Sequence, residues 1–241
     1  MDVEKADSTH EATAEASLSL QLTSTHEATL LGWQDVSYSV ITKKQGVKQI
    51  IDGQSGSAEP GKVLAIMGSS GAGKTTLLNV LSGRMLPGTI GGSVHVNGAV
   101  LHDRESFRRR VGFVQQDDLL MQTLTPKEAL TFSASLRLPR NTPSAQVESM
   151  VDVVVRELGL TSVKDSIIGA VGEGGISGGE RKRVSIGQEL VTDPSLLFVD
   201  EPTSGLDAYN ALKVPARQRP LCRSLSSPRP LVCACLCMQS R

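Results

Sequence analysis

The chain has 241 residues, of which 39% are hydrophobic and 21% are charged, an ordinary balance for a globular protein. Its 25 basic and 25 acidic side chains give a formal net charge of zero. This neutrality argues against a nucleic-acid partner, because dedicated nucleic-acid-binding proteins carry a strong basic excess. No apolar run approaches the roughly 18 residues of a membrane-spanning helix, and residues 1–30 lack the apolar stretch of a secretory signal.

The neutral total conceals an uneven distribution of charge. Residues 215–241 hold five arginines and no acidic residue, so the 20 basic and 25 acidic side chains of residues 1–214 sum to −5. All four cysteines and four of the 11 prolines lie in the same final segment. We therefore expect three parts: a leader at 1–30, a compact α/β unit at 31–214 and an aberrant Arg-, Cys- and Pro-rich tail at 215–241.

Residues 1–30 are predicted to form a disordered, low-complexity leader. They are rich in Ser, Thr, Glu and Ala, and they contain the hexapeptide STHEAT twice, at Ser8–Thr13 and Ser24–Thr29. A short recognition repeat is the alternative interpretation. His10 and His26 are expected to be solvated, because no other metal-ligand type clusters with them.

Residues 31–214 show the periodicities of a mixed α/β unit. Leu31–Ile41 alternates apolar and polar residues as a strand does, and Val63–Met67 is a short apolar run stopped by glycine, typical of a buried parallel strand. Asn97-Gly98 after Val94–Val96 predicts a hairpin turn. The other expected elements are helices at Thr76–Arg84 and within Thr125–Leu160, clearest at Ala145–Leu158, and a second buried strand at Leu196–Val199.

A glycine-rich segment joins the strand at Val63–Met67 to the helix at Thr76–Arg84. This segment, GSSGAGKT at Gly68–Thr75, fits the pattern G-x-x-x-x-G-K-[ST]. Its glycines let the backbone turn tightly, so that N–H groups converge on phosphate oxygens. Lys74 would supply charge to the β- and γ-phosphates, and the Thr75 hydroxyl would bind Mg²⁺. The segment therefore predicts binding of a nucleoside triphosphate.

Two acidic residues follow the apolar run Leu196–Val199. Asp200 would hold Mg²⁺, directly or through water, and Glu201 would polarise an attacking water as general base. Alone, such a pattern is often a strand that enters a solvated turn. Together with the loop at Gly68–Thr75, it predicts a nucleoside triphosphatase.

Three further segments resemble motifs of ATP-binding cassette (ABC) proteins and stand in the order of that family. They are the Q-loop at Val114–Asp118, the signature sequence ISGGERKR at Ile176–Arg183, with similarity through Val184–Pro194, and the D-loop at Ser204–Asp207. Glu180 in place of the commoner Gln, and Gln116-Asp117-Asp118 followed by Thr123-Leu124-Thr125, resemble the G (White) subfamily of half-transporters.

The resemblance implies a P-loop NTPase fold with a RecA-like core, a small antiparallel β part and an α-helical subdomain. It implies ATP and Mg²⁺ as cofactors and a second nucleotide-binding domain as partner, closing head to tail over two nucleotides. It also implies a membrane domain, a location at the cytoplasmic face of a membrane, and ATP-driven export of lipid-like or other apolar substrates.

The resemblance also assigns roles to individual residues. ATP is expected to contact Gly68, Ser69, Ser70, Gly71, Ala72, Gly73, Lys74, Thr75, Thr76 and Gln116. The partner's ATP is expected to meet Ser177, Gly178, Gly179 and Glu180. Mg²⁺ is expected at Thr75, Gln116 and Asp200, catalysis at Glu201, and the dimer seam at Asp207.

Two clusters of basic residues allow a nucleic-acid interpretation. They are Arg108–Arg110 and Arg181–Arg183, the second within the signature sequence. We interpret both instead as solvated basic stretches of helix.

The sequence departs from the family at two places. The position that often carries an aromatic adenine platform is Val40, for which Tyr38, two residues earlier on the same face, would only partly substitute. The switch histidine, expected on a strand after the D-loop, is absent, because no histidine lies beyond His102. That strand would occupy the middle of the sheet, so the C-terminal part of the sheet is expected to be missing.

The tail leaves several alternatives open. A frameshifted or intron-derived end is one explanation of its composition. Another is that Leu231–Met238 fills the missing strand position. A metal site is not expected at Cys233, Cys235 and Cys237, because alternate residues of a strand point to opposite faces and zinc sites usually use Cys-x-x-Cys pairs. For function, a catalytically inactive nucleotide-binding fragment and a soluble, non-transport ABC ATPase are the alternatives to a transporter ATPase.

Overall fold

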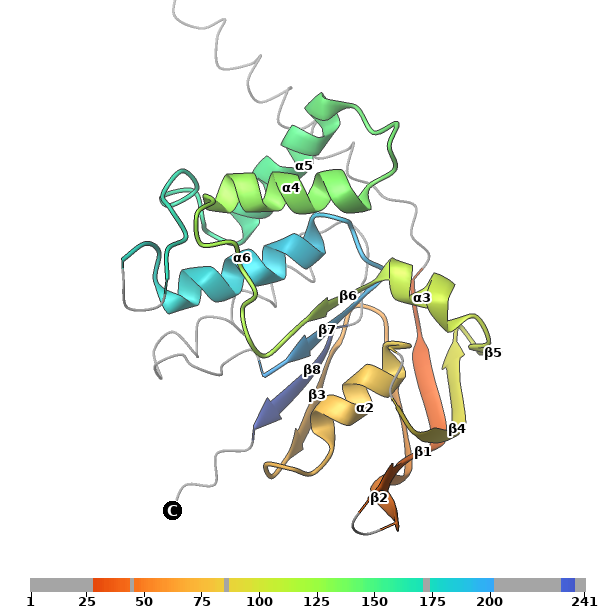
Figure 1. The fold of residues 1–241 in the computed structure, drawn as a ribbon. Coiled ribbons are helices and arrows are strands. Elements are labelled where there is room, and N and C mark those ends of the chain that lie inside the picture. The colour runs from red at the N-terminus through yellow and green to blue at the C-terminus, as the bar shows by residue number, and fades with distance from the viewer. Residues whose placement is uncertain (1–27, 44–45, 85–86, 171–173, 202–230, 237–241) are drawn as a thin grey trace, which may run out of the picture.

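The computed structural model describes residues 28–43, 46–84, 87–170 and 174–201, together with the backbone of 231–236. These residues form an antiparallel sheet, a parallel sheet and a group of three helices, arranged around the parallel sheet (Figure 1). The expected α/β class, with a small antiparallel β part and a helical part, is confirmed. The leader lies outside the described residues except for its last three.

The antiparallel sheet has the strand order β2-β1-β4-β5. Its strands are β1 (Leu31–Thr42), β2 (Gly46–Ala58), β4 (Thr89–Val96) and β5 (Ala99–Val100). β1 confirms the strand expected at Leu31–Ile41, and its apolar residues Leu31, Trp33, Val36 and Tyr38 are buried, whereas Ile41 near its end is exposed. Between β4 and β5, Asn97 and Gly98 have φ values of 50° and 83°. Two successive positive φ values are what a type I′ turn requires, so the predicted hairpin is confirmed.

The parallel sheet has the strand order β3-β8-β7-β6. Its strands are β3 (Val63–Gly68), β6 (Val111–Val114), β7 (Leu196–Asp200) and β8 (Leu231–Leu236), and all three pairings are parallel. β3 and β7 confirm the two expected parallel strands. β7 is buried throughout as expected, whereas burial is wrong for β3, whose residues alternate between exposed and partly exposed. β6 was not predicted, since a four-residue run is too short to show a period.

β8 corrects the expectation that the central strand of this sheet is missing. It lies between β3 and β7, with Leu231 opposite both Val63 and Leu197. The alternative, in which the apolar run Leu231–Met238 fills that position, is therefore the correct one for Leu231–Leu236. The physical reason is that a central parallel strand needs a short, continuous apolar run, and the sequence LVCACL supplies one.

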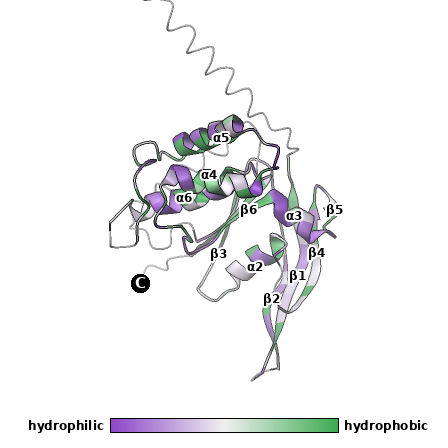
Figure 2. Ribbon diagram, turned by 45° about the horizontal axis from the view of Figure 1, so that its top comes forward, coloured by the Kyte–Doolittle hydropathy of each residue, from purple (hydrophilic) through white to green (hydrophobic). Residues whose placement is uncertain are grey.

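Helices cover both faces of the parallel sheet. On one side lies α2 (Lys74–Leu81), which begins two residues before the helix expected at Thr76–Arg84, and α3 (Arg104–Arg110) lies beside β6. On the other side lie α4 (Pro126–Arg137), α5 (Ser144–Glu157) and α6 (Gly178–Leu190) (Figure 1). α5 confirms the helix expected at Ala145–Leu158. Figure 2 shows that hydrophobic and hydrophilic residues alternate around these three helices.

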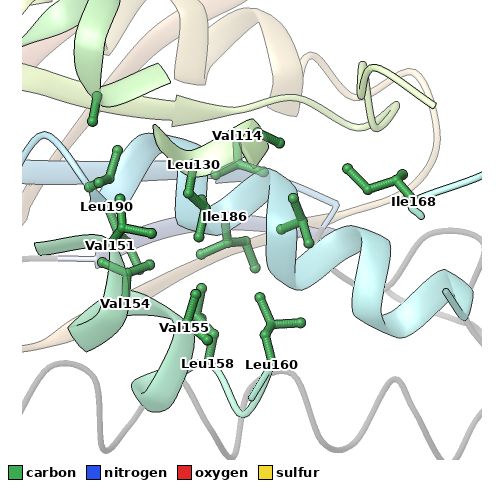
Figure 3. Close-up of a cluster of buried hydrophobic side chains, with 14 of the residues drawn as sticks. Val114, Leu130, Val151, Val154, Val155, Leu158, Leu160, Ile168, Ile186 and Leu190 are labelled. Carbon is green, nitrogen blue, oxygen red and sulfur yellow. The ribbon is translucent and has the colours of Figure 1, made fainter. Parts of the chain in front are cut away.

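Alternate residues of β7 divide the apolar core into two clusters. Leu197 and Val199 pack with α4, α5 and α6, where the side chains converge as Figure 3 shows. Leu196 and Phe198 pack with α2, α3 and the antiparallel sheet. Since successive side chains of a strand point to opposite faces, β7 is the wall that both clusters share.

Glycine allows the helices of the first cluster to approach closely. A Cβ at Gly187 of α6 would lie 2.8 Å from a methyl group of Leu130 and 2.9 Å from one of Leu158. These distances are below van der Waals contact, so a side chain at this position would force Leu130 and Leu158 to shift or α6 to move away from α4 and α5. α4 and α6 each begin with a capping box, Thr125 with Glu128 and Ser177 with Glu180.

Aromatic rings and a guanidinium group pack together in the second cluster, around Phe113 of β6. The rings of Phe113 and Phe198 stack with centroids 6.3 Å apart, and the Arg84 guanidinium lies 3.9 Å from the Phe113 centroid. The pKa of Arg84 lies below its usual value, mainly because burial disfavours the charged guanidinium. The charge of Glu189 opposes this shift, and the charge of Arg108 adds to it.

Candidate nucleotide-binding site

The glycine-rich loop lies between the end of β3 at Gly68 and the start of α2 at Lys74. Gly71 and Gly73 have φ values of 78° and 88°, which residues with a Cβ rarely adopt. A Cβ at Gly73 would also lie 3.0 Å from the Ile50 carbonyl oxygen of β2. The loop therefore has the strand–turn–helix context that the motif predicts, with its backbone N–H groups at the start of a helix.

Lys74 is only 8% exposed, and its ammonium group lies against the loop. It donates hydrogen bonds to the carbonyl oxygens of Gly68 at 3.0 Å and Ser69 at 2.8 Å. The side chain thus folds back from α2 over the loop. This holds a positive charge at the point where the loop backbone turns.

Thr75 of α2 and Asp200 at the end of β7 are in direct contact, although they lie 125 residues apart in the sequence. The Thr75 hydroxyl donates a hydrogen bond of 3.1 Å to Asp200 Oδ1. Parallel pairing explains the meeting, because Gly68 and Asp200 pair with Leu236 and Ala234 of β8 and so end at the same edge of the sheet. A hydroxyl and a carboxylate are hard oxygen ligands of the kind that Mg²⁺ prefers, so the pair fits the predicted metal.

Glu201 follows Asp200 and is 9% exposed. Within the described residues, its Oε2 atom is buried without a hydrogen-bond partner. Its φ of 45° lies in the left-handed region, which is strained for a residue other than glycine. A buried carboxylate oxygen with no protein partner is costly, and it fits a role in which the oxygen accepts a proton from a bound molecule.

Gln116 follows β6, the neighbour of β7, and so lies at the same edge of the sheet as Asp200. Its side chain is exposed. Its backbone carbonyl accepts a 2.9 Å hydrogen bond from Lys182 Nζ, as does that of Gln115. The Q-loop is thus held from α6.

The signature residues lie at the start of α6, on the other face of the sheet from α2 (Figure 1). Ser177 is the N-cap, and its backbone N–H and its hydroxyl each donate a 2.8 Å hydrogen bond to Glu180 Oε2. Gly178 and Gly179 form the first helical positions. The structure therefore does not bring these residues to the glycine-rich loop of the same chain.

The remaining predicted site residues have different outcomes. Thr76 lies in the first turn of α2. Asp207, the rest of the D-loop and the tail cysteines' side chains lie outside what the structure describes. Tyr38 is 3% exposed and donates a hydrogen bond of 2.7 Å to the Pro87 carbonyl oxygen, so the expectation that its ring partly replaces an adenine platform is wrong.

The interpretation of Arg181–Arg183 as solvated is wrong, whereas Arg108–Arg110 is exposed as expected. Lys182 is 1% exposed. Arg181 is half-buried and donates to the carbonyl oxygens of Ile168, Gly169 and Ala170 at 2.9, 2.7 and 3.3 Å. The reason is that the acceptors are backbone carbonyls, which a charge pattern does not reveal.

Two further kinds of feature are absent from the described residues. No group of three or more His, Cys, Asp or Glu residues there could hold a metal ion. In the same ranges, no helix has the length and apolar character needed to cross a bilayer.

Comparison with known proteins gives matches over most of the chain. The model of the family described as ABC transporter matches residues 51–204. The chain is 48% identical over 186 residues to ABC transporter G family member 22 of Arabidopsis thaliana, covering 76% of this chain and 24% of that protein. It is also 48% identical over 186 residues to a probable ATP-dependent permease of Saccharomyces cerevisiae, covering 76% of this chain and 18% of that protein.

Among solved structures, the chain resembles cbiO1 from Clostridium perfringens, part of the ABC transporter complex cbiONQ. The TM-score is 0.73 at 24% identity, covering 88% of this chain and 80% of that chain. This likeness shows the fold. The chain spans about a quarter or less of the length of the two relatives named above. The match over residues 51–204 and the similarity to G family members show that the chain belongs to the ABC transporter family.

Proposed function

We propose that this chain binds ATP with Mg²⁺ and hydrolyses it as the nucleotide-binding domain of a longer transporter. The observation that carries the proposal is the hydrogen bond between Thr75 and Asp200. It joins the end of the glycine-rich loop to the acidic residue of a neighbouring strand, at the edge where parallel strands end.

The loop residues Gly68–Thr75, followed by Thr76, bind the phosphates through backbone N–H groups at the start of α2. Lys74 turns its ammonium from the loop carbonyls toward the phosphate oxygens, which are stronger acceptors because they are charged. Thr75 and Asp200 hold Mg²⁺ with their oxygen atoms, and Gln116 approaches it from the adjacent strand end. When bound, Mg²⁺ supplies neutralisation of the phosphate charge.

Glu201 acts as the general base. Its buried Oε2 atom lacks a partner within the described residues and so retains the capacity to accept a proton. In hydrolysis, Glu201 orients a water and takes its proton as the water oxygen bonds to the terminal phosphorus. The bond from that phosphorus to the bridging oxygen breaks, releasing ADP and phosphate.

A second nucleotide-binding domain completes the site. Ser177, Gly178, Gly179 and Glu180 lie on the other face of the sheet from α2 and their own loop, which supports a role for them in contacting a nucleotide on a partner. The backbone N–H groups at the start of α6 favour an anion there. Asp207 lies at the seam between the two domains in this proposal.

The longer protein is proposed to be a G-type exporter. Support comes from the relatives, which are several times longer than this chain and are named ABC transporter G family members. The missing length would include a membrane domain, which places the nucleotide-binding domain at the cytoplasmic face of a membrane. Lipid-like or other apolar molecules are the proposed substrates.

A binding-only fragment is the second candidate, and the absence of any histidine after His102 favours it. Without a histidine at the γ-phosphate, the chain would bind MgATP but leave it intact. The two candidates differ in turnover alone.

Phosphate release by the purified chain, compared with Glu201→Gln, separates them. Turnover at least tenfold above that of Glu201→Gln supports the hydrolase. Equal turnover with Mg²⁺-dependent binding of a fluorescent ATP analogue supports the binding-only fragment. Lys74→Met is the control that lacks the phosphate-binding lysine. If the wild-type chain binds the analogue no better than Lys74→Met does, both candidates are overturned.

A further inference from the structure

Lys182 is the most deeply buried charged side chain among the described residues, at 1% exposure. Its ammonium group donates hydrogen bonds of 2.9 Å to the carbonyl oxygens of Gln115 and Gln116. It also lies 3.2 Å from Asp118 Oδ1, an ion-pair distance. Three oxygen atoms of residues 115–118 thus lie close to the Lys182 ammonium group, which has three N–H donors.

A second contact joins α6 to the same strand and loop. Glu189, seven residues after Lys182, accepts a 3.1 Å hydrogen bond from the Phe113 backbone N–H through Oε2. The same oxygen pairs with Arg137 of α4 at 3.0 Å. Positions seven apart lie on one face of a helix, so α6 holds Phe113–Gln116 at two points along that face.

The position of β6 explains why such contacts are needed. β6 is at the edge of the parallel sheet formed by the described strands, so no strand within these residues pairs with its outer side. Glu189 accepts a hydrogen bond from the Phe113 N–H, and Lys182 donates hydrogen bonds to the carbonyl oxygens just after the strand ends. Because the Lys182 side chain is 1% exposed, its ammonium group cannot replace these protein acceptors by water at low cost.

We propose that Lys182 is a positioning residue that fixes the Gln116 backbone to the signature helix. Ser177 and Lys182 lie five residues apart on α6, so a displacement of the signature residues carries Lys182 with it. Since Lys182 binds the carbonyl oxygens of the two peptide groups that flank the Gln116 Cα, Gln116 follows. The signature residues and Gln116 would then move as one unit. This inference rests on the proposed function only in giving Gln116 a role at Mg²⁺.

Hydrogen exchange without nucleotide tests the contact itself. Lys182→Met keeps the length of the side chain and removes its charge and donors. We expect amides of residues 115–120 to exchange at least about tenfold faster, while those of α5 change less than twofold. Lys62→Met is the matched control, because Lys62 is exposed and pairs with the exposed Glu59 at the surface. Unchanged exchange at 115–120, or an equal rise throughout the chain, overturns the proposal.

If Lys182→Met does not fold, Asp118→Asn decides the question. It leaves the lysine and its two carbonyl acceptors in place and removes the paired charge. We expect a smaller, at least threefold, acceleration confined to residues 115–120. An Asp118→Asn chain with wild-type exchange in this segment contradicts the proposal.

A double-mutant cycle tests whether Lys182 acts through Gln116. We expect Lys182→Met to weaken Mg²⁺-dependent binding of a fluorescent ATP analogue about tenfold, and to have less than a twofold further effect in a Gln116→Ala chain. Full additivity means that Lys182 affects binding by another route, and overturns the coupling. If no variant binds the analogue, the proposed function fails while the exchange experiment still tests the contact.

Discussion

Replacing Glu201 by Gln is expected to stabilise the chain and to abolish turnover. The carboxylate is 9% exposed, and its Oε2 atom is buried without a partner in the part of the chain described. Leaving a buried polar group unpaired costs about 1–3 kcal/mol, and more for a charged group. Gln keeps the shape and removes the charge, so we expect a gain of about 1–2 kcal/mol in the free energy of unfolding.

The gain in stability should raise Tm. For a domain of this size, 1 kcal/mol corresponds to about 2–4 °C, so the expected rise is about 2–8 °C. The strained φ of 45° is retained in the variant and does not contribute. Turnover should fall by about 10²–10⁴-fold, because an amide cannot accept the proton of water.

Thermal unfolding without nucleotide and phosphate release with MgATP measure the two effects on the same preparation. Glu148→Gln is the matched control, since the same chemical change at this exposed position of α5 should alter stability by no more than about 0.5 kcal/mol. A fall in Tm for Glu201→Gln would show that the carboxylate has a stabilising partner, and would refute the argument from its unpaired oxygen.

Three further variants test the site and the sheet. Thr75→Val removes the hydroxyl that donates to Asp200 and should weaken MgATP-analogue binding at least about tenfold, with little effect on binding without Mg²⁺; equal binding by both chains counts against the metal pair. Gly187→Ala should lower the free energy of unfolding in urea by about 1–3 kcal/mol through overcrowding, even though Ala is the better helix former by about 1 kcal/mol; a net gain would mean that the helices can separate freely. Ala234 lies opposite both Ile66 and Asp200, so Ala234→Pro should lower the free energy of unfolding by about 3 kcal/mol or more and abolish analogue binding. Ala99→Pro, on the edge strand β5, should lower it less. A folded Ala234→Pro chain that binds the analogue would contradict the central position of β8.

Features that depend on neighbouring residues were predictable from the sequence. The loop at Gly68–Thr75 needs glycine at positions of positive φ, and the structure has φ values of 78° and 88° at Gly71 and Gly73. The turn at Asn97-Gly98 follows the same logic. These local requirements leave a direct trace in residue type, so motif and turn could be identified without the fold.

Features that depend on distant partners were not predictable in the same way. The apolar run at Leu231–Leu236 would fit several positions in a parallel sheet. Its residue types do not reveal that it pairs with β3 and β7, because both partner strands lie far from it in the sequence. The burial of Lys182 depends on carbonyl oxygens 66 and 67 residues away. Every residue has a carbonyl, so nothing in the residue types around Gln116 marks it as an acceptor.

The two long-range contacts at the sheet edge have complementary consequences. The hydrogen bond from Thr75 to Asp200 ties α2 to the end of β7 on one face of the sheet, and the bonds from Lys182 tie α6 to the end of β6 on the other. β6 and β7 are adjacent and register from Val111 with Leu196 to Val114 with Val199. The two contacts therefore end on neighbouring strands at the same edge of the sheet, one from each face.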